Sequence, residues 1–177
     1  MKKEENIKLG ISIGDLNGIG AEIVLRIFED NRMLDFCTPI IFASIKTMSF
    51  VKNHFNLDIN LNGIQNVSQA LHGRVNVLNC WKENVAINFG QEDLKIGEYA
   101  IKSLEQATKS LKEEEIDLLV TAPINKHNIQ SETFKFPGHT DYLNQELEGN
   151  SLMFMVSDGL RVGLLTDHVP VKDIAMH

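Results

Sequence analysis

Two histidines in the second half of the sequence stand where an imidazole ring could do chemistry. His139 follows Pro137-Gly138, a pair that forces a turn, so its ring is presented at a corner beside the hydroxyl of Thr140. Imidazole can donate a hydrogen bond or transfer a proton near neutral pH. A histidine at a turn is more often structural or simply exposed, so the residues alone leave both interpretations open.

His168 is the second candidate. It follows an apolar run, 162–166, and its acidic neighbour Asp167 could orient a metal-bound imidazole. No second ligand lies two to four residues further on, so a metal site would be completed from far along the chain or from another subunit. A buried histidine with satisfied hydrogen bonds is the structural alternative.

A glycine-punctuated segment, 14–20, lies between a predicted strand and a predicted helix, where backbone N–H groups favour anions. Its spacing matches neither the dinucleotide-binding nor the Walker pattern, and a purely structural turn is the alternative. Asp15 and Glu22 could be catalytic, or could cap the helix and meet its positive end. Further on, Asn125 and Lys126 could hold a phosphate or carboxylate, or Asn125 could cap a turn.

Hydrophobic periodicity predicts the elements that must position these residues. Strands are predicted at 7–13, 39–43 and 116–120, with short strands near 59–61 and 75–80, and helices at 21–28, 45–55 and 94–112. The apolar run at 116–120 is typical of the interior of a sheet. Alternating strands and helices predict parallel pairing with right-handed crossovers, and the carboxyl edge of such a sheet is where ligands bind.

The pattern changes after 122. A loop leads into a short helix near 127, a helix is predicted at 140–147, and Asp158-Gly159 between two apolar runs predicts an antiparallel hairpin, in a mixed sheet or a second lobe. Pro170 opens a helix of about two turns, which is marginal alone. We therefore expect a piece of a longer protein, with a parallel α/β lobe over 1–122 and the truncated start of a second lobe over 123–177.

Composition excludes several classes of protein. The chain has 177 residues, of which 43% are hydrophobic and 23% charged, as in soluble globular domains. A formal net charge of −7 argues against a nucleic-acid partner. Two cysteines without paired spacing suit a reducing compartment, and neither a signal peptide nor an apolar stretch of about 18 residues is present. We expect a cytoplasmic protein that does not bind membranes.

Four motifs occur in order, at 14–22, 117–126, 137–141 and 167–174. Together they resemble the 4-hydroxythreonine-4-phosphate dehydrogenase family, NAD-dependent enzymes of the vitamin B6 route, over essentially the whole chain. Two positions depart from the family pattern, which usually has proline where Asn17 and Ala21 stand. These departures are expected to loosen the first turn.

The resemblance implies an isocitrate/isopropylmalate-dehydrogenase-like mixed α/β sandwich in two lobes, incomplete here, and a homodimer with active sites at the interface. The implied reaction is oxidation of 4-phosphooxy-L-threonine by NAD or NADP with subsequent decarboxylation, assisted by a divalent metal (Zn, Mg or Co) acting as a Lewis acid. Carried over by motif, His139 and Thr140 bind substrate and His168 supplies one metal ligand. The other ligands and most of the cofactor site lie downstream in the family, so we expect the isolated chain to be inactive.

Two alternatives remain. A paralogue of the same family could act on a phosphorylated threonate or erythronate, and no residue of this sequence separates these substrates. The second alternative belongs to a different functional class: a non-catalytic α/β module that binds a small anion.

Overall fold

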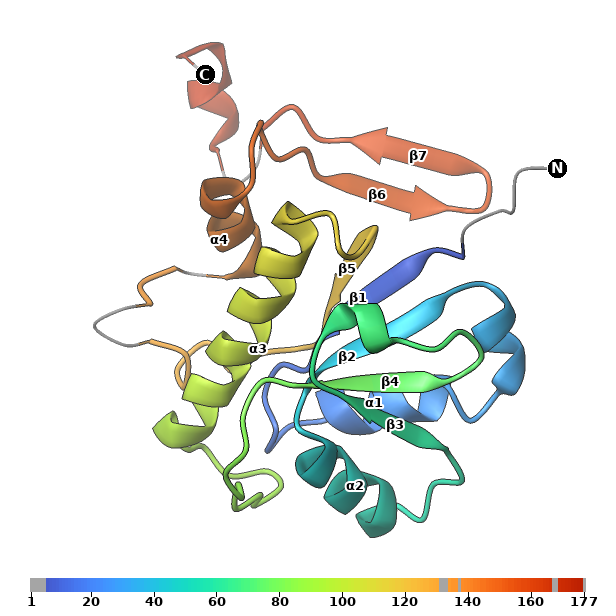
Figure 1. Cartoon of the computed structure of the whole chain (residues 1–177). Helices are drawn as coiled ribbons and strands as arrows, with labels where there is room; N and C mark the ends of the chain where they lie inside the picture. The colour runs from blue at the N-terminus through green and yellow to red at the C-terminus, as the bar shows by residue number, and fades with distance from the viewer. Residues whose placement is uncertain (1–5, 131–133, 137, 167–168, 177) are drawn as a thin grey trace, which may run out of the picture. The chain divides into compact units, whose positions relative to one another are not determined.

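The computed structural model describes residues 6–130, 134–136, 138–166 and 169–176 (Figure 1). The chain divides into two compact units, 1–139 and 140–177, each of which is described by itself. The lobe boundary predicted after residue 122 remains a prediction. No described helix is long and apolar enough to cross a membrane.

A parallel sheet forms the centre of the first unit. Its strands are β1 (Lys8–Ser12), β2 (Thr38–Ala43), β3 (Leu61–Ile64), β4 (Val75–Asn79) and β5 (Leu118–Thr121). They lie in the order β3-β4-β2-β1-β5, and every neighbouring pair is parallel. The predicted parallel pairing is therefore confirmed.

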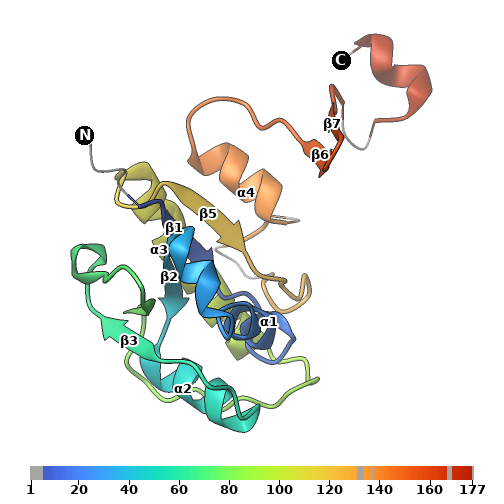
Figure 2. The same ribbon diagram turned by 90° about the vertical axis from the view of Figure 1, so that its right-hand side faces the viewer.

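Helices cover both faces of this sheet. They are α1 (Gly20–Ile27), α2 (Ile45–His54) and α3 (Leu94–Lys112). Short 3-10 turns lie between α1 and β2 at Asn31–Asp35 and between β3 and β4 at Val67–Gln69. Side chains of α1 and α2 pack with Ile11, Ile41 and Val77 on one face, whereas Ala107 of α3 packs with Phe42 on the other. Alternation along each strand thus supplies two apolar layers, and the helix layers can be followed in Figure 2.

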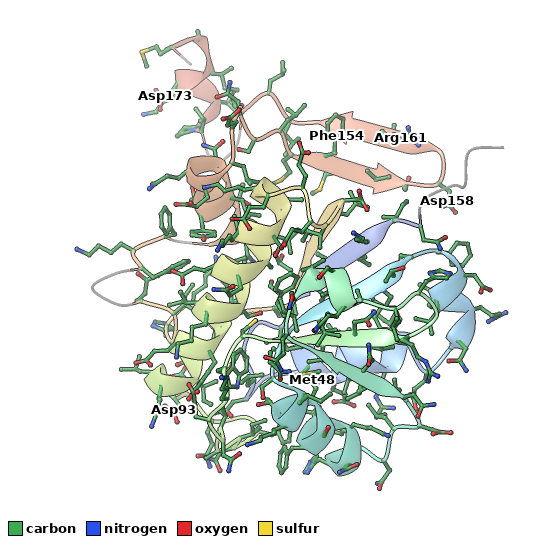
Figure 3. The ribbon with its side chains drawn as sticks, viewed as in Figure 1. Met48, Asp93, Phe154, Asp158, Arg161 and Asp173 are labelled. Atoms are coloured by element: carbon green, nitrogen blue, oxygen red, sulfur yellow. The ribbon has the colours of Figure 1, made fainter. Side chains whose placement is uncertain are left out.

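Polar contacts fix α3 against the sheet. Asp93, labelled in Figure 3, caps the helix by accepting a hydrogen bond from the backbone N–H of Lys95 at 2.8 Å. Further along α3, the buried hydroxyl of Ser103 accepts from the N–H of Ile13 at 2.8 Å and donates to the carbonyl of Phe42 at 2.5 Å. Ser103 therefore ties α3 to the carboxyl ends of both β1 and β2.

The position of β5 differs from the sequence prediction. Its apolar run predicts an interior strand, yet among the described residues β5 pairs with β1 alone and is an edge strand. Leu118 and Val120 are consequently about half exposed, at 53% and 49%. Which neighbours a strand receives depends on the whole topology, so the local pattern could not decide this.

The second unit holds a hairpin and short helical segments. Helix α4 (His139–Glu146) leads into it, and β6 (Phe154–Ser157) and β7 (Leu160–Gly163) pair antiparallel as a separate two-stranded sheet. The predicted hairpin is confirmed, with Asp158 at its tip (Figure 3), while the mixed-sheet alternative is wrong for the described strands. The helix predicted after Pro170 is present as a 3-10 helix, Val171–Met176.

Candidate functional site

The direction of strand addition reverses at β1. From β1 the chain adds β2 on one side, and it later returns to add β5 on the other side. In open α/β sheets the loops that leave such a switch point at the carboxyl ends of the strands form the usual ligand-binding crevice. Here these loops are the glycine segment after β1 and residues 122–129 after β5.

The two loops interlock. Gly14 has a φ of +67°, and a Cβ added there would lie 2.2 Å from the carbonyl oxygen of Pro123, so only glycine fits. The next N–H, that of Asp15, donates to the same carbonyl at 2.9 Å. A Cβ at Gly20 would lie 3.2 Å from the Cβ of Ala122, so the start of α1 also packs against the end of β5. Two motifs far apart in sequence thus form one structure.

The acidic side chains of this segment do not cap α1. The N-cap residue, Ile19, makes no side-chain capping bond, while Asp15 uses Oδ1 to accept from the N–H of Asn17 at 3.0 Å and so closes its own turn. Glu22 pairs with Arg26 one turn along the helix at 2.7 Å. Side-chain capping is therefore wrong for both residues, whereas Glu22 does lie in the first turn of α1, at the positive end of the helix. A catalytic role for either remains untested.

Burial affects the acidity of Asp15. Loss of hydration raises the pKa of this carboxyl group above 3.8, and the hydrogen bond from the N–H of Asn17 opposes part of that change. Asp15 thus ionises less readily than an exposed aspartate. A carboxyl group with a raised pKa at a switch point is a common feature of functional sites, though ionic networks produce it too.

Asn17 holds a segment that the sequence did not single out. Its buried side chain accepts from the N–H of Asn88 at 2.9 Å and donates to the carbonyl of Gln91 at 3.0 Å. Its own carbonyl accepts from the N–H of Gly90 at 2.8 Å. Residues 88–91 are therefore fastened across the glycine turn by Asn17. Whether the turn is looser than with the family's prolines stays a prediction. The sequence analysis assigns no element to residues 88–91; the available signal was an amide side chain among glycines.

Asn125 is a turn cap. Its Oδ1 accepts from the N–H of His127 at 2.9 Å and of Asn128 at 3.2 Å, which forms a turn where the sequence predicted a short helix. Its Nδ2 donates to Glu92 at 3.4 Å. Lys126 is exposed beside it. The capping interpretation is confirmed for Asn125, while anion binding by either residue is not tested.

His139 stands at the first position of α4. The residue is partly buried, and its Nε2 is shielded from solvent with no hydrogen-bond partner among the described residues. Burial lowers the pKa of the imidazole below 6.5, so the ring is neutral at pH 7. A neutral ring with an unused nitrogen can donate to or accept from a ligand. Thr140 is exposed, and His168 lies outside the described residues.

The described residues do not by themselves supply a metal centre. Across residues 6–130, 134–136, 138–166 and 169–176, no three histidine, cysteine or carboxylate side chains come together in a group that could hold an ion. Catalytic zinc sites use three protein ligands. A metal site involving His168 would therefore need ligands from outside these ranges.

Comparison with known proteins identifies the family. Residues 35–177 match the family model described as Pyridoxal phosphate biosynthetic protein PdxA. The chain is 42% identical over 175 residues to a 4-hydroxythreonine-4-phosphate dehydrogenase of Bacteroides thetaiotaomicron, covering 98% of this chain and 48% of that protein. It is 31% identical to a Clostridium botulinum protein provisionally named D-threonate 4-phosphate dehydrogenase, covering 93% and 50% of the two chains.

A solved structure agrees. The crystal structure of a 4-hydroxythreonine-4-phosphate dehydrogenase from Burkholderia phymatum superimposes with a TM-score of 0.86 at 25% identity, over 96% of this chain and 52% of that chain. The fold class implied by the sequence resemblance is thereby confirmed. The chain spans about half the length of the curated relatives it matches. It belongs to the PdxA family of pyridoxal phosphate biosynthetic proteins, whose named members are dehydrogenases.

Proposed function

We propose that this chain supplies part of the active site of an NAD- or NADP-dependent dehydrogenase that oxidises 4-phosphooxy-L-threonine in pyridoxal phosphate biosynthesis. The observation that carries the proposal is the 42% identity to a 4-hydroxythreonine-4-phosphate dehydrogenase across nearly the whole chain. In the proposed reaction the secondary alcohol of the substrate loses a hydride to the nicotinamide cofactor and a proton to a base. The resulting 3-oxo acid then loses carbon dioxide.

His139 and Thr140 are the proposed substrate contacts. The shielded Nε2 of His139 lacks a partner among the described residues, and a substrate oxygen would satisfy it. Because burial lowers its pKa, the imidazole would act as a neutral hydrogen-bonding group. The exposed hydroxyl of Thr140 is available to the same ligand.

His168 is proposed to supply one ligand to a divalent metal ion, for which zinc, magnesium and cobalt are the candidates. Such an ion would polarise the alcohol oxygen of the substrate. The remaining ligands would come from outside the described residues, and the full-length assembly is proposed to be a homodimer with sites at the interface.

A titration of the 177-residue chain tests the substrate contacts. Adding 4-phosphooxy-L-threonine should shift the NMR signals of the His139 imidazole saturably, and His139→Gln should weaken binding about tenfold, the equivalent of one good hydrogen bond. L-threonine and inorganic phosphate serve as control ligands. Binding that His139→Gln leaves unchanged would remove His139 from the site.

Turnover is the second readout. The chain alone, with NAD and zinc or magnesium, should form no NADH from this substrate, because most of the family's ligand set is not in it. Measurable NADH formation would refute the partial-site proposal. For the metal, cobalt binding followed by visible absorption should be weak in the wild type and weaker still in His168→Gln; equal binding by both would exclude His168.

A second candidate substrate is D-threonate 4-phosphate, favoured by the 31% identity to the clostridial protein. The two substrates differ in the group at the carbon next to the carboxylate, amino in one and hydroxyl in the other. Parallel titrations with both compounds decide between them, since the true substrate should bind more tightly and perturb His139 at the lower concentration.

A further inference from the structure

The connection between β4 and α3, residues 80–93, contains neither a helix nor a strand. Connections of this length without regular structure are uncommon in compact domains and usually carry a function. The middle of this one follows an alternating pattern: Val85, Ile87 and Phe89 are partly buried and pack against the hydrophobic core, whereas the residues between them are exposed. We call residues 84–92 the strap.

Helix α2 supports one side of the strap. Just before it, the indole N–H of Trp81 donates to the hydroxyl of Thr47 at 3.3 Å. Further along, the ring centroid of Phe89 lies 4.7 Å from that of His54 and 5.2 Å from that of Phe55. Aromatic rings attract one another at such separations, so Phe89 is held at the end of α2. Figure 1 shows the segment running between α2 and the start of α3.

The glycine segment holds the strap at the same point. Asn88 and Gly90 flank Phe89 in the chain, and the N–H groups of both donate to Asn17, one to its side chain and one to its backbone carbonyl. The side-chain amide of Asn17 also donates to the carbonyl of Gln91. Hydrogen bonds from a single residue therefore fix the backbone around Phe89, while α2 fixes its ring.

The far end of the strap supports the turn that follows β5. Glu92 accepts a hydrogen bond from the side-chain amide of Asn125 at 3.4 Å. A Cβ added at Gly97, near the start of α3, would overlap the backbone carbonyl of Asn128, so only glycine lets the turn lie this close to the helix. The turn therefore rests on the end of the strap and on the helix that continues it.

Lys126 is the cation that this turn carries. The residue is exposed and forms no ion pair among the described residues. The side chain of Asn125 fixes the backbone around it by accepting from the N–H groups of His127 and Asn128. The turn also lies at the carboxyl edge of the sheet, where open α/β folds bind ligands. A cation on a preorganised backbone loses less freedom when it binds an anion.

We propose that the strap positions Lys126 to bind the anionic part of a ligand, a phosphate ester or a carboxylate, and that Asn17 is the positioning residue that holds the strap. The choice of ligand rests on the proposed function, whose substrate carries both groups. Loss of the Asn17 side chain should then move the turn at 125–129, although Asn17 has no hydrogen bond to that turn among the described residues.

Amide NMR spectra of the ligand-free 177-residue chain test the positioning. Asn17→Ala and Phe89→Leu release the strap from its two opposite supports, and each should shift the amide signals of residues 125–129. Asn60→Ala, at an exposed asparagine outside the strap, should leave them unchanged. Spectra are recorded where every variant is fully folded, so a residue that contributes only to stability would not move these signals. Unshifted signals in both strap variants overturn the positioning role.

Titration with two phosphate esters, 4-phosphooxy-L-threonine and D-threonate 4-phosphate, tests the ligand contact. Lys126→Gln should weaken binding about tenfold, the equivalent of one charged hydrogen bond. Lys112→Gln, at an exposed lysine at the other end of α3, should bind as wild type does. Asn17→Ala should weaken binding about threefold or more when Lys126 is present and have no further effect in Lys126→Gln, since residues that act as one unit are not additive.

The outcomes separate this proposal from the proposed function. Equal binding of both esters by wild type and Lys126→Gln, additive losses in the double variant, or no binding of either ester by wild type overturns the strap proposal. Binding of D-threonate 4-phosphate alone, weakened in Lys126→Gln, supports the strap and contradicts the proposed substrate. L-threonine has the carboxylate without the phosphate, so binding of it that depends on Lys126 assigns the contact to the carboxylate, and binding of the esters alone assigns it to the phosphate.

Discussion

The backbone N–H of Asp15 donates a hydrogen bond to the carbonyl oxygen of Pro123 at 2.9 Å, joining the loop after β1 to the loop after β5. Gly14 makes this approach possible, because any Cβ at that position would overlap the same carbonyl. This contact therefore joins two motifs at the carboxyl edge of the sheet. Its contribution to stability can be measured through the residues that form it.

Gly14→Ala should lower the free energy of unfolding by about 2–4 kcal/mol, since the new methyl group meets the Pro123 carbonyl and the backbone has a positive φ. Gly73 separates these two causes, because its φ is +74° and nothing lies within 4 Å of an added Cβ. Gly73→Ala should therefore cost only about 1 kcal/mol, from backbone strain alone. Urea denaturation measures both; equal losses would show that the loops do not interlock.

Asn17→Ala should destabilise the protein by about 1–3 kcal/mol, because it leaves the N–H of Asn88 and the carbonyl of Gln91 without their side-chain partner. The amide proton of Asn88 should also exchange with solvent faster. Asn60→Ala, at an exposed asparagine, is the matched control and should have little effect. Unchanged exchange at Asn88 would contradict the role given to Asn17.

Asp15→Asn should raise the free energy of unfolding at pH 7, because the amide keeps the acceptor for the N–H of Asn17 and removes a partly buried charge. Burial raises the pKa of Asp15 above 3.8, so the folded state holds this proton more tightly than the unfolded state. Its contribution to stability therefore falls as pH rises from 3.8 through the folded-state pKa. Urea denaturation between pH 3.5 and about 7 should therefore show the stability of Asp15→Asn increasing relative to wild type as pH rises, whereas the control Asp58→Asn should keep the pH dependence of wild type. Lower stability of Asp15→Asn at pH 7 would be the contrary result.

The imidazole of His139 should titrate below pH 6.5, because burial disfavours its charged form and lowers its pKa. Below pH 6.5 the unfolded chain takes up a proton that the folded chain does not, so stability falls as pH drops through the window below 6.5. His139→Gln should remove that part of the fall. NMR titration of the imidazole ring measures the midpoint directly, and the signal is assigned to His139 because it disappears in His139→Gln. A midpoint at or above pH 6.5 would contradict the burial of the ring.

Local sequence pattern was sufficient for the long helices and for the hairpin. The helices at 94–112 and 45–55 follow from the spacing of apolar residues, because that spacing repeats with the period of an α-helical backbone. The hairpin follows from Asp158-Gly159, whose preference for a tight turn is equally local. The order of four motifs was enough to indicate the family, and with it the candidate roles of His139 and Thr140.

Only the tertiary structure decided which residues meet. Whether a strand such as β5 is central or at an edge depends on neighbours that no local pattern contains. Asn17 looked like a weak point of the glycine turn, yet its amide is matched by backbone groups of residues 88–91. The sequence alone thus determined the elements and the family, because both are recorded in residue types and their spacing. The clamp at Asn17 and the shielding of His139 Nε2, which has no hydrogen-bond partner among the described residues, depend on long-range packing that only the folded chain displays.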